Sequence, residues 1–96
     1  MSTIPRWIDG ARTTGVSTRT SDVFNPATGS VAAQVVLAEQ ADVDLAVSSS
    51  LKAAQSWSES SLSTRSRILF AYRHLLHSHR DELAAIITSE HGKVLS

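Results

Sequence analysis

The distribution of glycine and proline divides this chain into two halves, and it constrains the fold more than any other feature. Both prolines, three of the four glycines and most of the β-branched residues lie before residue 38. Residues 39–92 contain no proline and a single glycine, Gly92. Glycine and proline mark turns, and proline interrupts a helix, so the first half favours strands and the second favours helices. The sequence therefore predicts an α/β chain, with short strands over residues 1–38 and helices over residues 39–92.

Length, charge and cysteine content narrow the class of protein. The 96 residues suffice for at most one small domain, and 19% charged with 42% hydrophobic residues is typical of a globular chain. Nine basic and nine acidic residues give a net charge of zero, which argues against a nucleic-acid partner because phosphate binding requires a basic surplus. The chain has no cysteine, so these residues supply no disulfide, thiolate zinc site or cysteine nucleophile.

The apolar segments are too short to cross a membrane. A spanning helix needs about 20 consecutive apolar residues, and no run in the chain approaches that length. Residues 1–5 have neither the basic region nor the apolar region of a secretory signal. We therefore expect no membrane association and a cytoplasmic location.

Two turn signals organise the strand half. Asp9-Gly10 follows a short apolar stretch and is a strong hairpin dipeptide, because Gly10 adopts a positive φ at low steric cost. The second signal is NPATG at residues 25–29, with apolar residues on both sides, which predicts a second hairpin. The polar segment between them, residues 13–21, is predicted to be a loop or an edge strand.

Three amphipathic helices are predicted in the second half. The first spans about residues 40–55, and the third spans about residues 80–91 with Gly92 as its stop. The second begins at an N-cap, Ser61 or Ser63. The stripes of apolar or small side chains are Val43, Ala46, Val47, Ser50, Leu51 and Ala54 in the first helix, Ile68, Leu69, Tyr72, Leu75 and Leu76 in the second, and Leu83, Ile86 and Ile87 in the third.

These elements offer little apolar surface to one another. Two short hairpins with few large apolar residues are marginally stable unless they join a larger sheet. We therefore expect the chain to pack against a part of the fold that is not among these residues. Of the two tryptophans, Trp57 is expected to anchor the junction between the first two helices, and Trp7 is expected to pack on its hairpin.

Histidine is the residue type that most invites a catalytic or metal-binding interpretation. His74 and His77 lie three residues apart on the second helix, a spacing at which two imidazoles can share a metal ion, and His79 follows. No cysteine or carboxylate completes a ligand set at a recognisable spacing. The simpler interpretation is a solvated helix end with imidazoles near the C-terminal dipole, and we predict no metal ligand.

Other catalytic and cofactor motifs are missing from the sequence. There is no GxSxG elbow, no GxGxxG fingerprint and no GxxxxGK[ST] loop. Glu90 and His91 are adjacent, but neighbouring residues on a helix point about 100° apart and do not form an acid–base pair. The segment 90–93 is better explained as a helix C-terminus. The residues themselves therefore predict no catalytic residue and no cofactor-binding residue in this chain.

The order and spacing of several short motifs resemble the N-terminal stretch of the aldehyde dehydrogenase superfamily. The resemblance covers nearly the whole chain, and no single motif carries it. Its parts are WIDG at 7–10, VFNPATGSV at 23–31, ADVDLAV at 41–47, Trp57, Arg65 and Arg67 before an apolar helix, and RDELAAIITSEHGK at 80–93. Within the superfamily, the chain is most similar to the methylmalonate-semialdehyde dehydrogenases, a CoA-acylating branch. The motifs that carry this similarity are IPRWIDG at 4–10, the segment 15–19 leading to DVFNPATG at 22–29, and SEHGK at 89–93. In the last of these motifs, many other branches carry glutamine in place of His91.

The resemblance implies an NAD-dependent oxidation of an aldehyde. In the family, a cysteine thiolate attacks the aldehyde, hydrogen-bond donors hold the resulting oxyanion, and hydride passes to NAD to leave a thioester. In the CoA-acylating branch, coenzyme A takes the acyl group, and the methylmalonate-semialdehyde enzymes also release carbon dioxide to give propionyl-CoA. The cysteine, its oxyanion partner and the nucleotide-binding units lie downstream in the family, so the resemblance assigns no catalytic, cofactor or metal residue to these 96 residues.

The resemblance further implies that the chain is part of a larger unit. We expect residues 1–96 to be the N-terminal part of the family's NAD-binding domain, incomplete and inactive alone, with no cofactor bound to it. Its expected partners are the rest of the dehydrogenase chain and, in the full-length family, further copies of the same protein. Three alternatives stay open: an ordinary NAD(P)-dependent aldehyde dehydrogenase that hydrolyses its thioester, a stand-alone interaction module that uses its amphipathic helices, and a dehydrogenase remnant without function.

Overall fold

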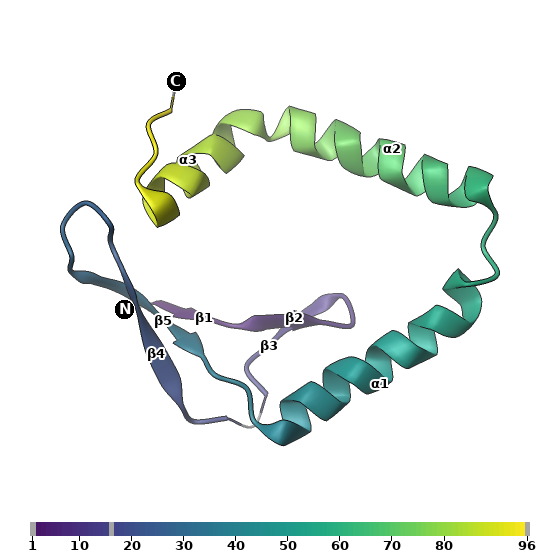
Figure 1. Cartoon of the computed structure of the whole chain (residues 1–96), viewed down its shortest axis with the longest axis horizontal. Coiled ribbons are helices and arrows are strands. Elements are labelled where there is room, and N and C mark those ends of the chain that lie inside the picture. The colour runs from purple at the N-terminus through teal and green to yellow at the C-terminus, as the bar shows by residue number, and fades with distance from the viewer. Residues whose placement is uncertain (1, 16, 96) are drawn as a thin grey trace.

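Within the residues that the structure describes, five strands precede three helices, in the order that the sequence predicts. The computed structural model describes residues 2–15 and 17–95. Figure 1 shows the strands gathered in one part of the molecule and the helices following one another along an arc that leads away from the sheet and back toward it. The strands lie within residues 2–36 and the helices within residues 40–91. The α/β class is confirmed, whereas the assignment of these residues to an NAD-binding domain stays a prediction.

The first hairpin forms where Asp9-Gly10 predicts it. Strand β2 (Arg6–Ile8) pairs antiparallel with β3 (Ala11–Thr13), and the two residues between them have positive φ angles, 53° at Asp9 and 72° at Gly10. Two successive positive φ angles are the signature of a type I′ turn, whose twist matches the strands it connects. The expectation that Trp7 packs on this hairpin is wrong: Trp7 is 68% exposed, because two three-residue strands offer too little surface to cover an indole.

The second hairpin belongs to a three-stranded sheet. Strand β5 (Val31–Val36) pairs antiparallel with β4 (Thr20–Phe24) and in parallel with β1 (Ser2–Ile4), which gives the order β1-β5-β4. The turn between β4 and β5 closes through Asn25, whose side-chain and carbonyl oxygens each accept a backbone N–H of the turn at 2.8 Å. The sequence does not indicate β1, because three residues are too few to show a period-two pattern and the partner strand is distant.

The polar segment at residues 13–21 is part strand and part loop. Its first residue ends β3, and its last two, Thr20 and Ser21, begin β4 at the edge of the sheet. The described residues between these strands form neither helix nor strand, and Val16 lies outside the described residues. The prediction of a loop or edge strand is confirmed for the described part.

Helix α1 (Gln40–Trp57) begins with two carboxylates that satisfy its first N–H groups. Glu39 is the N-cap residue and Asp42 the third residue of the helix, and each side chain accepts the backbone N–H of the other. The bond from the Glu39 N–H to Asp42 Oδ2 measures 2.9 Å. The helix continues two residues beyond the predicted end at Gln55.

Helices α2 (Leu62–Ser78) and α3 (Arg80–His91) follow with only His79 between them. Ser61 is the N-cap of α2, and its hydroxyl accepts a backbone N–H of the first turn at 3.1 Å, which decides between the two candidate serines. Helix α3 has the predicted bounds and ends at Gly92, whose φ of 84° is the left-handed conformation that closes a helix. No helix among the described residues has the length and apolarity needed to cross a bilayer.

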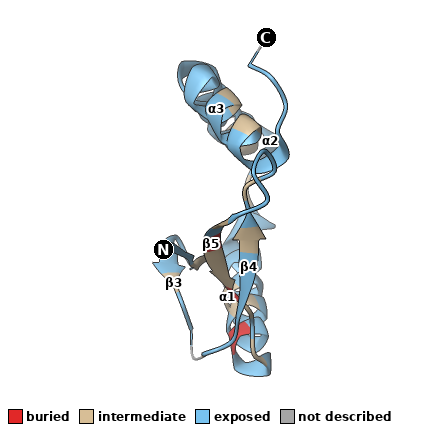
Figure 2. Cartoon of the chain, turned by 90° about the vertical axis from the view of Figure 1, so that its left-hand side faces the viewer, coloured by how far each residue is buried: buried red, intermediate tan, exposed pale blue. Residues whose placement is uncertain are grey.

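Few apolar residues of the described chain are buried. Ala33 and Val36 in β5 are the buried apolar residues of the described chain, and α2 has no buried residue. Figure 2 shows the helices exposed along most of their length, with the buried residues at the sheet and the start of α1. The radius of gyration is 17.3 Å, whereas a globular chain of this length is expected to have about 12.5 Å.

The shortest dimension shows that the fold has a single layer. The molecule measures 48 × 39 × 14 Å, and a helix with its side chains is about 10–12 Å across, so only one element fits in the thickness. Domains need at least two packed layers to bury an apolar face. The three helices instead expose large apolar side chains: Val43, Leu45, Val47, Leu51, Trp57, Leu62, Ile68, Leu69, Phe70, Tyr72, Leu75, Leu76, Leu83, Ile86 and Ile87.

Candidate functional site

A buried ion pair joins the first hairpin to helix α1. Arg6 in β2 and Asp42 in α1 approach to 3.1 Å between nitrogen and oxygen, and the Asp42 side chain is only 4% exposed. The Arg6 guanidinium also donates to the carbonyl oxygens of Thr14, at 2.6 Å, and Val36, at 3.3 Å. Asp42 therefore both caps α1 and holds Arg6, so one carboxylate positions the hairpin, the end of the sheet and the helix start relative to one another.

Gly15 lies against this ion pair and leaves no room for a side chain. A Cβ on its backbone would fall on Asp42 Oδ1 and Arg6 Nη2, and its φ of 64° is a conformation that glycine adopts at low cost. A Cβ at Gly10, where φ is 72°, would meet no atom within 4 Å. Gly15 is thus required by packing as well as by its φ angle.

An exposed ion pair continues the network from the helix cap. Arg19 Nε donates to Glu39 Oε1 at 2.7 Å, and the Ser17 hydroxyl donates to the same oxygen at 3.3 Å. The hydrogen bond from Arg19, together with its positive charge, lowers the pKa of Glu39 below its ordinary range, and Glu39 in turn raises the pKa of Arg19. The Glu39 carboxylate is therefore kept ionised while it caps α1.

The N-termini of α1 and α3 do not fit a phosphate group. A helix N-terminus binds anions through free N–H groups and the positive end of its dipole. At α1, the capping box occupies the N–H groups of Glu39 and Asp42, and the carboxylates of the same two residues place negative charge where a phosphate would bind. At α3, Asp81 and Glu82 lie in the first turn. These ends therefore offer no fitting site for the pyrophosphate of NAD or of coenzyme A.

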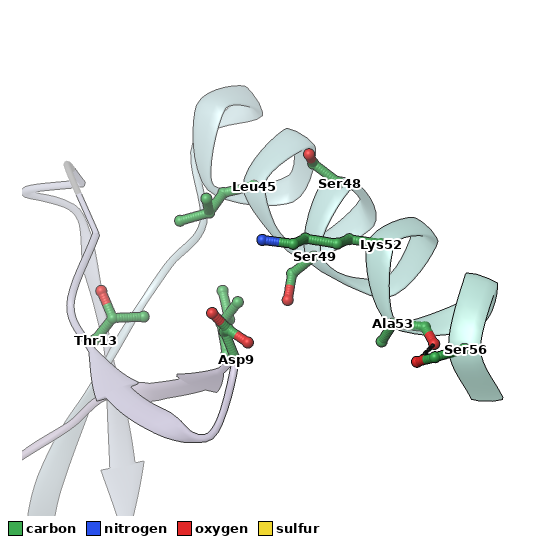
Figure 3. Close-up of a pocket in the computed structure, with 9 residues that line it drawn as sticks. Asp9, Thr13, Leu45, Ser48, Ser49, Lys52, Ala53 and Ser56 are labelled. Atoms are coloured by element: carbon green, nitrogen blue, oxygen red, sulfur yellow. Dashed lines mark hydrogen bonds between the residues drawn. The ribbon is translucent and has the colours of Figure 1, made fainter.

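A cleft of about 580 Å³ lies between the first hairpin and helix α1. Figure 3 shows Asp9 at the hairpin turn facing the helix, with Ser49 and Lys52 on the helix side of the cleft. A serine hydroxyl becomes a nucleophile only beside a base such as histidine, and no histidine lines this cleft. The cleft offers hydrogen bonds and one charge of each sign, and its lining residues are Ile8, Asp9, Thr13, Leu45, Ser48, Ser49, Lys52, Ala53 and Ser56.

A mainly apolar groove of about 330 Å³ lies in the angle between α2 and α3. We call it the elbow groove, and its lining residues are Tyr72, Leu75, Leu76, His79, Glu82, Leu83 and Ile86. All of its apolar members belong to the stripes predicted on the second and third helices. Leu75 is 55% exposed and Ile86 is 49% exposed, so the described chain leaves this face largely open to solvent.

The histidines of the described residues do not form a cluster that could hold a metal ion. His74 and His77 line a groove on α2 together with Phe70, a residue that the predicted apolar stripe does not include. His79 Nδ1 lies 3.1 Å from Glu82 Oε2 at the start of α3. No group of three potential histidine, cysteine or carboxylate ligands occurs in residues 2–15 and 17–95. The prediction that the chain supplies no catalytic or metal residue stays a prediction.

Trp57 and Arg65 hold the turn between α1 and α2. The Arg65 guanidinium carbon lies 5.3 Å from the centre of the Trp57 ring, a cation–π contact. Arg65 also donates to the carbonyl oxygens of Trp57 at 2.9 Å, Ser58 at 3.3 Å and Ser60 at 3.2 Å. Trp57 is confirmed as the anchor of this junction. The sequence does not predict these contacts of Arg65, because hydrogen bonds to backbone carbonyl groups leave no pattern in the sequence.

Comparison with known proteins decides the family. The family model of the aldehyde dehydrogenases matches residues 13–96, which is most of the chain. The chain belongs to the aldehyde dehydrogenase family. The resemblance read from its short motifs is thereby confirmed, and it extends to relatives named for malonate and methylmalonate semialdehyde.

Three relatives show how much of an aldehyde dehydrogenase the chain represents. It is 44% identical over 90 residues to malonate-semialdehyde dehydrogenase 2 of Bacillus cereus, an alignment that covers 94% of this chain and 18% of the relative. It is 39% identical over 93 residues to malonate-semialdehyde dehydrogenase of Listeria monocytogenes serotype 4a, which covers 97% and 19%. The third is a crystal structure from Sinorhizobium meliloti 1021, assigned as a methylmalonate-semialdehyde dehydrogenase complexed with NAD. It matches with a TM-score of 0.94 and 39% identity over 99% of this chain and 19% of that chain.

The structural match accounts for the single layer. The chain spans less than one fifth of the relatives' length. A TM-score of 0.94 means that the sheet and the arc of helices are arranged as they are in the Sinorhizobium meliloti structure, which belongs to a chain about five times as long. The open arc is therefore the shape that the matching N-terminal segment has in an aldehyde dehydrogenase of known structure.

Proposed function

We propose that this chain is the N-terminal structural segment of an NAD-dependent, CoA-acylating semialdehyde dehydrogenase. The observation that carries the proposal is the agreement in fold, at a TM-score of 0.94 over 99% of the chain, with a methylmalonate-semialdehyde dehydrogenase complexed with NAD. The 44% identity to a malonate-semialdehyde dehydrogenase supports a substrate of the same kind. Malonate and methylmalonate semialdehyde differ by one methyl group, so the proposed substrate is a short aldehyde that carries a carboxylate.

The segment's proposed contribution is position and not chemistry. These 96 residues contain no cysteine, so the thiolate that would attack the aldehyde belongs to another part of the enzyme. Arg6 and Asp42 hold the sheet to α1, and Arg65 holds α1 to α2. Together they keep the arc of helices in the shape that receives the rest of the fold.

A chimeric enzyme tests the proposal. Residues 1–96 are joined to the sequence of the Bacillus cereus relative that follows its matched segment, and the unaltered relative serves as the control; this protein is called the chimera below. We expect the chimera to reduce NAD with malonate or methylmalonate semialdehyde and to form an acyl-CoA when coenzyme A is present, and the 96-residue chain alone to do neither.

Two other results would change the proposal in different ways. A folded chimera that oxidises neither aldehyde, beside an active control, would contradict the assignment to this branch. A chimera that oxidises the aldehyde but releases a free acid with no need for coenzyme A would instead support an ordinary aldehyde dehydrogenase.

A further inference from the structure

We propose that the side of α2 opposite its apolar stripe binds an acidic segment of another protein. We call this side the basic face, and its residues, all of them exposed, are Arg67, Phe70, Arg73, His74 and His77. The inference goes beyond the proposed function, because it assigns a protein partner to a surface that takes no part in the aldehyde chemistry.

The basic face is a continuous stripe along α2. Its other members lie three residues before Phe70 and three, four and seven residues after it, the spacing that places side chains on one side of a helix. With a turn of about 100° per residue, they all lie within about 60° of Phe70 around the helix axis. Tyr72, in the predicted apolar stripe, lies two residues and therefore about 160° from Phe70.

The positive charge of this face has no counterpart close by. Residues 60–80 contain four arginines and three histidines but no aspartate or glutamate, although the whole chain is neutral. Within the described chain, the guanidinium groups of Arg67 and Arg73 form no ion pair, whereas Arg65 is held by Trp57 and three carbonyl oxygens. A guanidinium group stays charged and matches a carboxylate through two parallel hydrogen bonds. The basic face therefore suits a partner that supplies carboxylates.

The composition of the basic face is that of a protein interface. Arginine is almost never fully buried without a partner, so the side of α2 that carries Arg67 and Arg73 stays in water in a complete enzyme. Phe70, between these two arginines, is nevertheless 65% exposed. Aromatic residues and arginine are the types enriched at protein interfaces and at the positions that carry most of the binding energy.

The shape of the basic face favours a protein segment over a small molecule. Phe70, Arg73, His74 and His77 line an open hollow of about 290 Å³, and all four come from one helix, so a small ligand would bury little of its surface there. Nucleic acid is disfavoured because the chain has no basic surplus. A helical segment with carboxylates on each side of an apolar side chain would meet the arginines and Phe70 together.

A peptide-binding measurement on the chimera tests the proposal. The probe is a fluorescent helical peptide with glutamates on each side of one leucine along a single face, and the control peptide has glutamine in place of each glutamate. Fluorescence anisotropy gives the affinity of the two peptides. We expect the glutamate peptide to bind about tenfold more tightly, with a difference that shrinks as salt is added because the charges are exposed.

Substitutions on the basic face distinguish it from the rest of the surface. Arg67→Gln combined with Arg73→Gln is expected to abolish the preference for the glutamate peptide, and Phe70→Ala is expected to weaken the binding of both peptides by about tenfold. Arg12→Gln is the matched control, since it removes an exposed arginine of β3 that also forms no ion pair in the described chain. We expect Arg12→Gln to bind as the native chimera does. Substitutions at exposed positions change stability little, and thermal unfolding followed by circular dichroism checks that each variant is folded.

Several outcomes would overturn the inference. Equal affinities for the two peptides, or equal losses in Arg12→Gln and in the double arginine variant, would exclude the basic face as the site. Duplex DNA that binds as tightly as the glutamate peptide would contradict the class of partner. Dissociation of a chimera oligomer by the double arginine variant, seen in light scattering, would assign the face to a second copy instead. The proposed function is tested separately by NAD reduction, so a folded, inactive chimera that binds the glutamate peptide would contradict the function alone.

Discussion

Replacement of Gly15 by alanine is expected to open the junction between the first hairpin and helix α1. The new methyl group would fall on Asp42 Oδ1 and Arg6 Nη2. Neither group is free to move aside: Asp42 is 4% exposed and caps α1, and Arg6 is held by two carbonyl oxygens. The substitution must therefore separate the ion pair or displace the loop that carries residue 15.

The expected cost has two parts that a control can separate. A residue other than glycine in the left-handed conformation costs about 1–2 kcal/mol. Removing one partner from a buried ion pair costs about 3–5 kcal/mol, and we expect about 2 kcal/mol for the steric part here because the exposed loop can shift. Gly10→Ala is the matched control, since its φ of 72° carries the same strain and its Cβ meets no atom within 4 Å.

Hydrogen exchange of the chimera, followed by mass spectrometry, measures the difference in destabilisation between Gly15→Ala and Gly10→Ala. Amides at the start of α1 exchange through local opening, so their rate reports the free energy of that opening. A difference of about 2 kcal/mol corresponds to exchange about thirtyfold faster in Gly15→Ala than in Gly10→Ala. Equal rates at the start of α1 in the two variants would refute the packing role assigned to Gly15.

Three further perturbations test individual contacts. Ser61→Ala removes the N-cap of α2 and is expected to destabilise the first turn of the helix by about 1 kcal/mol, as measured by hydrogen exchange. Ser63→Ala is expected to leave the stability of this turn unchanged, and similar effects of the two variants would contradict the assignment of the cap. Arg65→Lys loses the planar group that contacts Trp57 and three carbonyl oxygens, so limited proteolysis at residues 57–61 should be faster. An unchanged cleavage rate would argue against the role of Arg65 in holding the turn between α1 and α2. Because the folded-state pKa of Glu39 is lowered, its stabilisation is present above the ordinary glutamate value of about 4.3 and is lost as the pH falls through the lower folded value. Glu39→Gln should therefore reduce helix content at neutral pH and flatten its acid dependence in circular dichroism, and an unaltered acid transition would refute this.

The features that the sequence predicts correctly depend on residues close together along the chain. The turn at Asp9-Gly10 needs only two residues with positive φ. The cap at Ser61 acts on the first turn of its own helix, and Gly92 closes the helix that directly precedes it. Such local chemistry leaves a short, recognisable pattern, which is why these element bounds agree with the structure to within two residues or fewer where both ends were predicted.

The features that the sequence does not reveal join residues that are far apart. The parallel pairing of β1 with β5, the Arg6–Asp42 ion pair and the position of Gly15 against it all depend on how distant segments are brought together. The same reason explains the error at Trp7, since its exposure depends on what else covers the hairpin. The family, in contrast, could be read from motifs in order along the chain, and the match over residues 13–96 confirms it.

The central claim is that the apolar side of α2 and α3 is covered by the rest of a dehydrogenase chain. The native sequence has no cysteine, so Leu76→Cys places a single thiol in the elbow groove, and His74→Cys places one on the opposite side of α2. The rate of maleimide labelling at each position is measured by mass spectrometry in the 96-residue chain and in the chimera. The account predicts that labelling at position 76 slows by about tenfold or more in the chimera, while labelling at position 74 is unchanged. Equal rates at position 76 in the two proteins would contradict it.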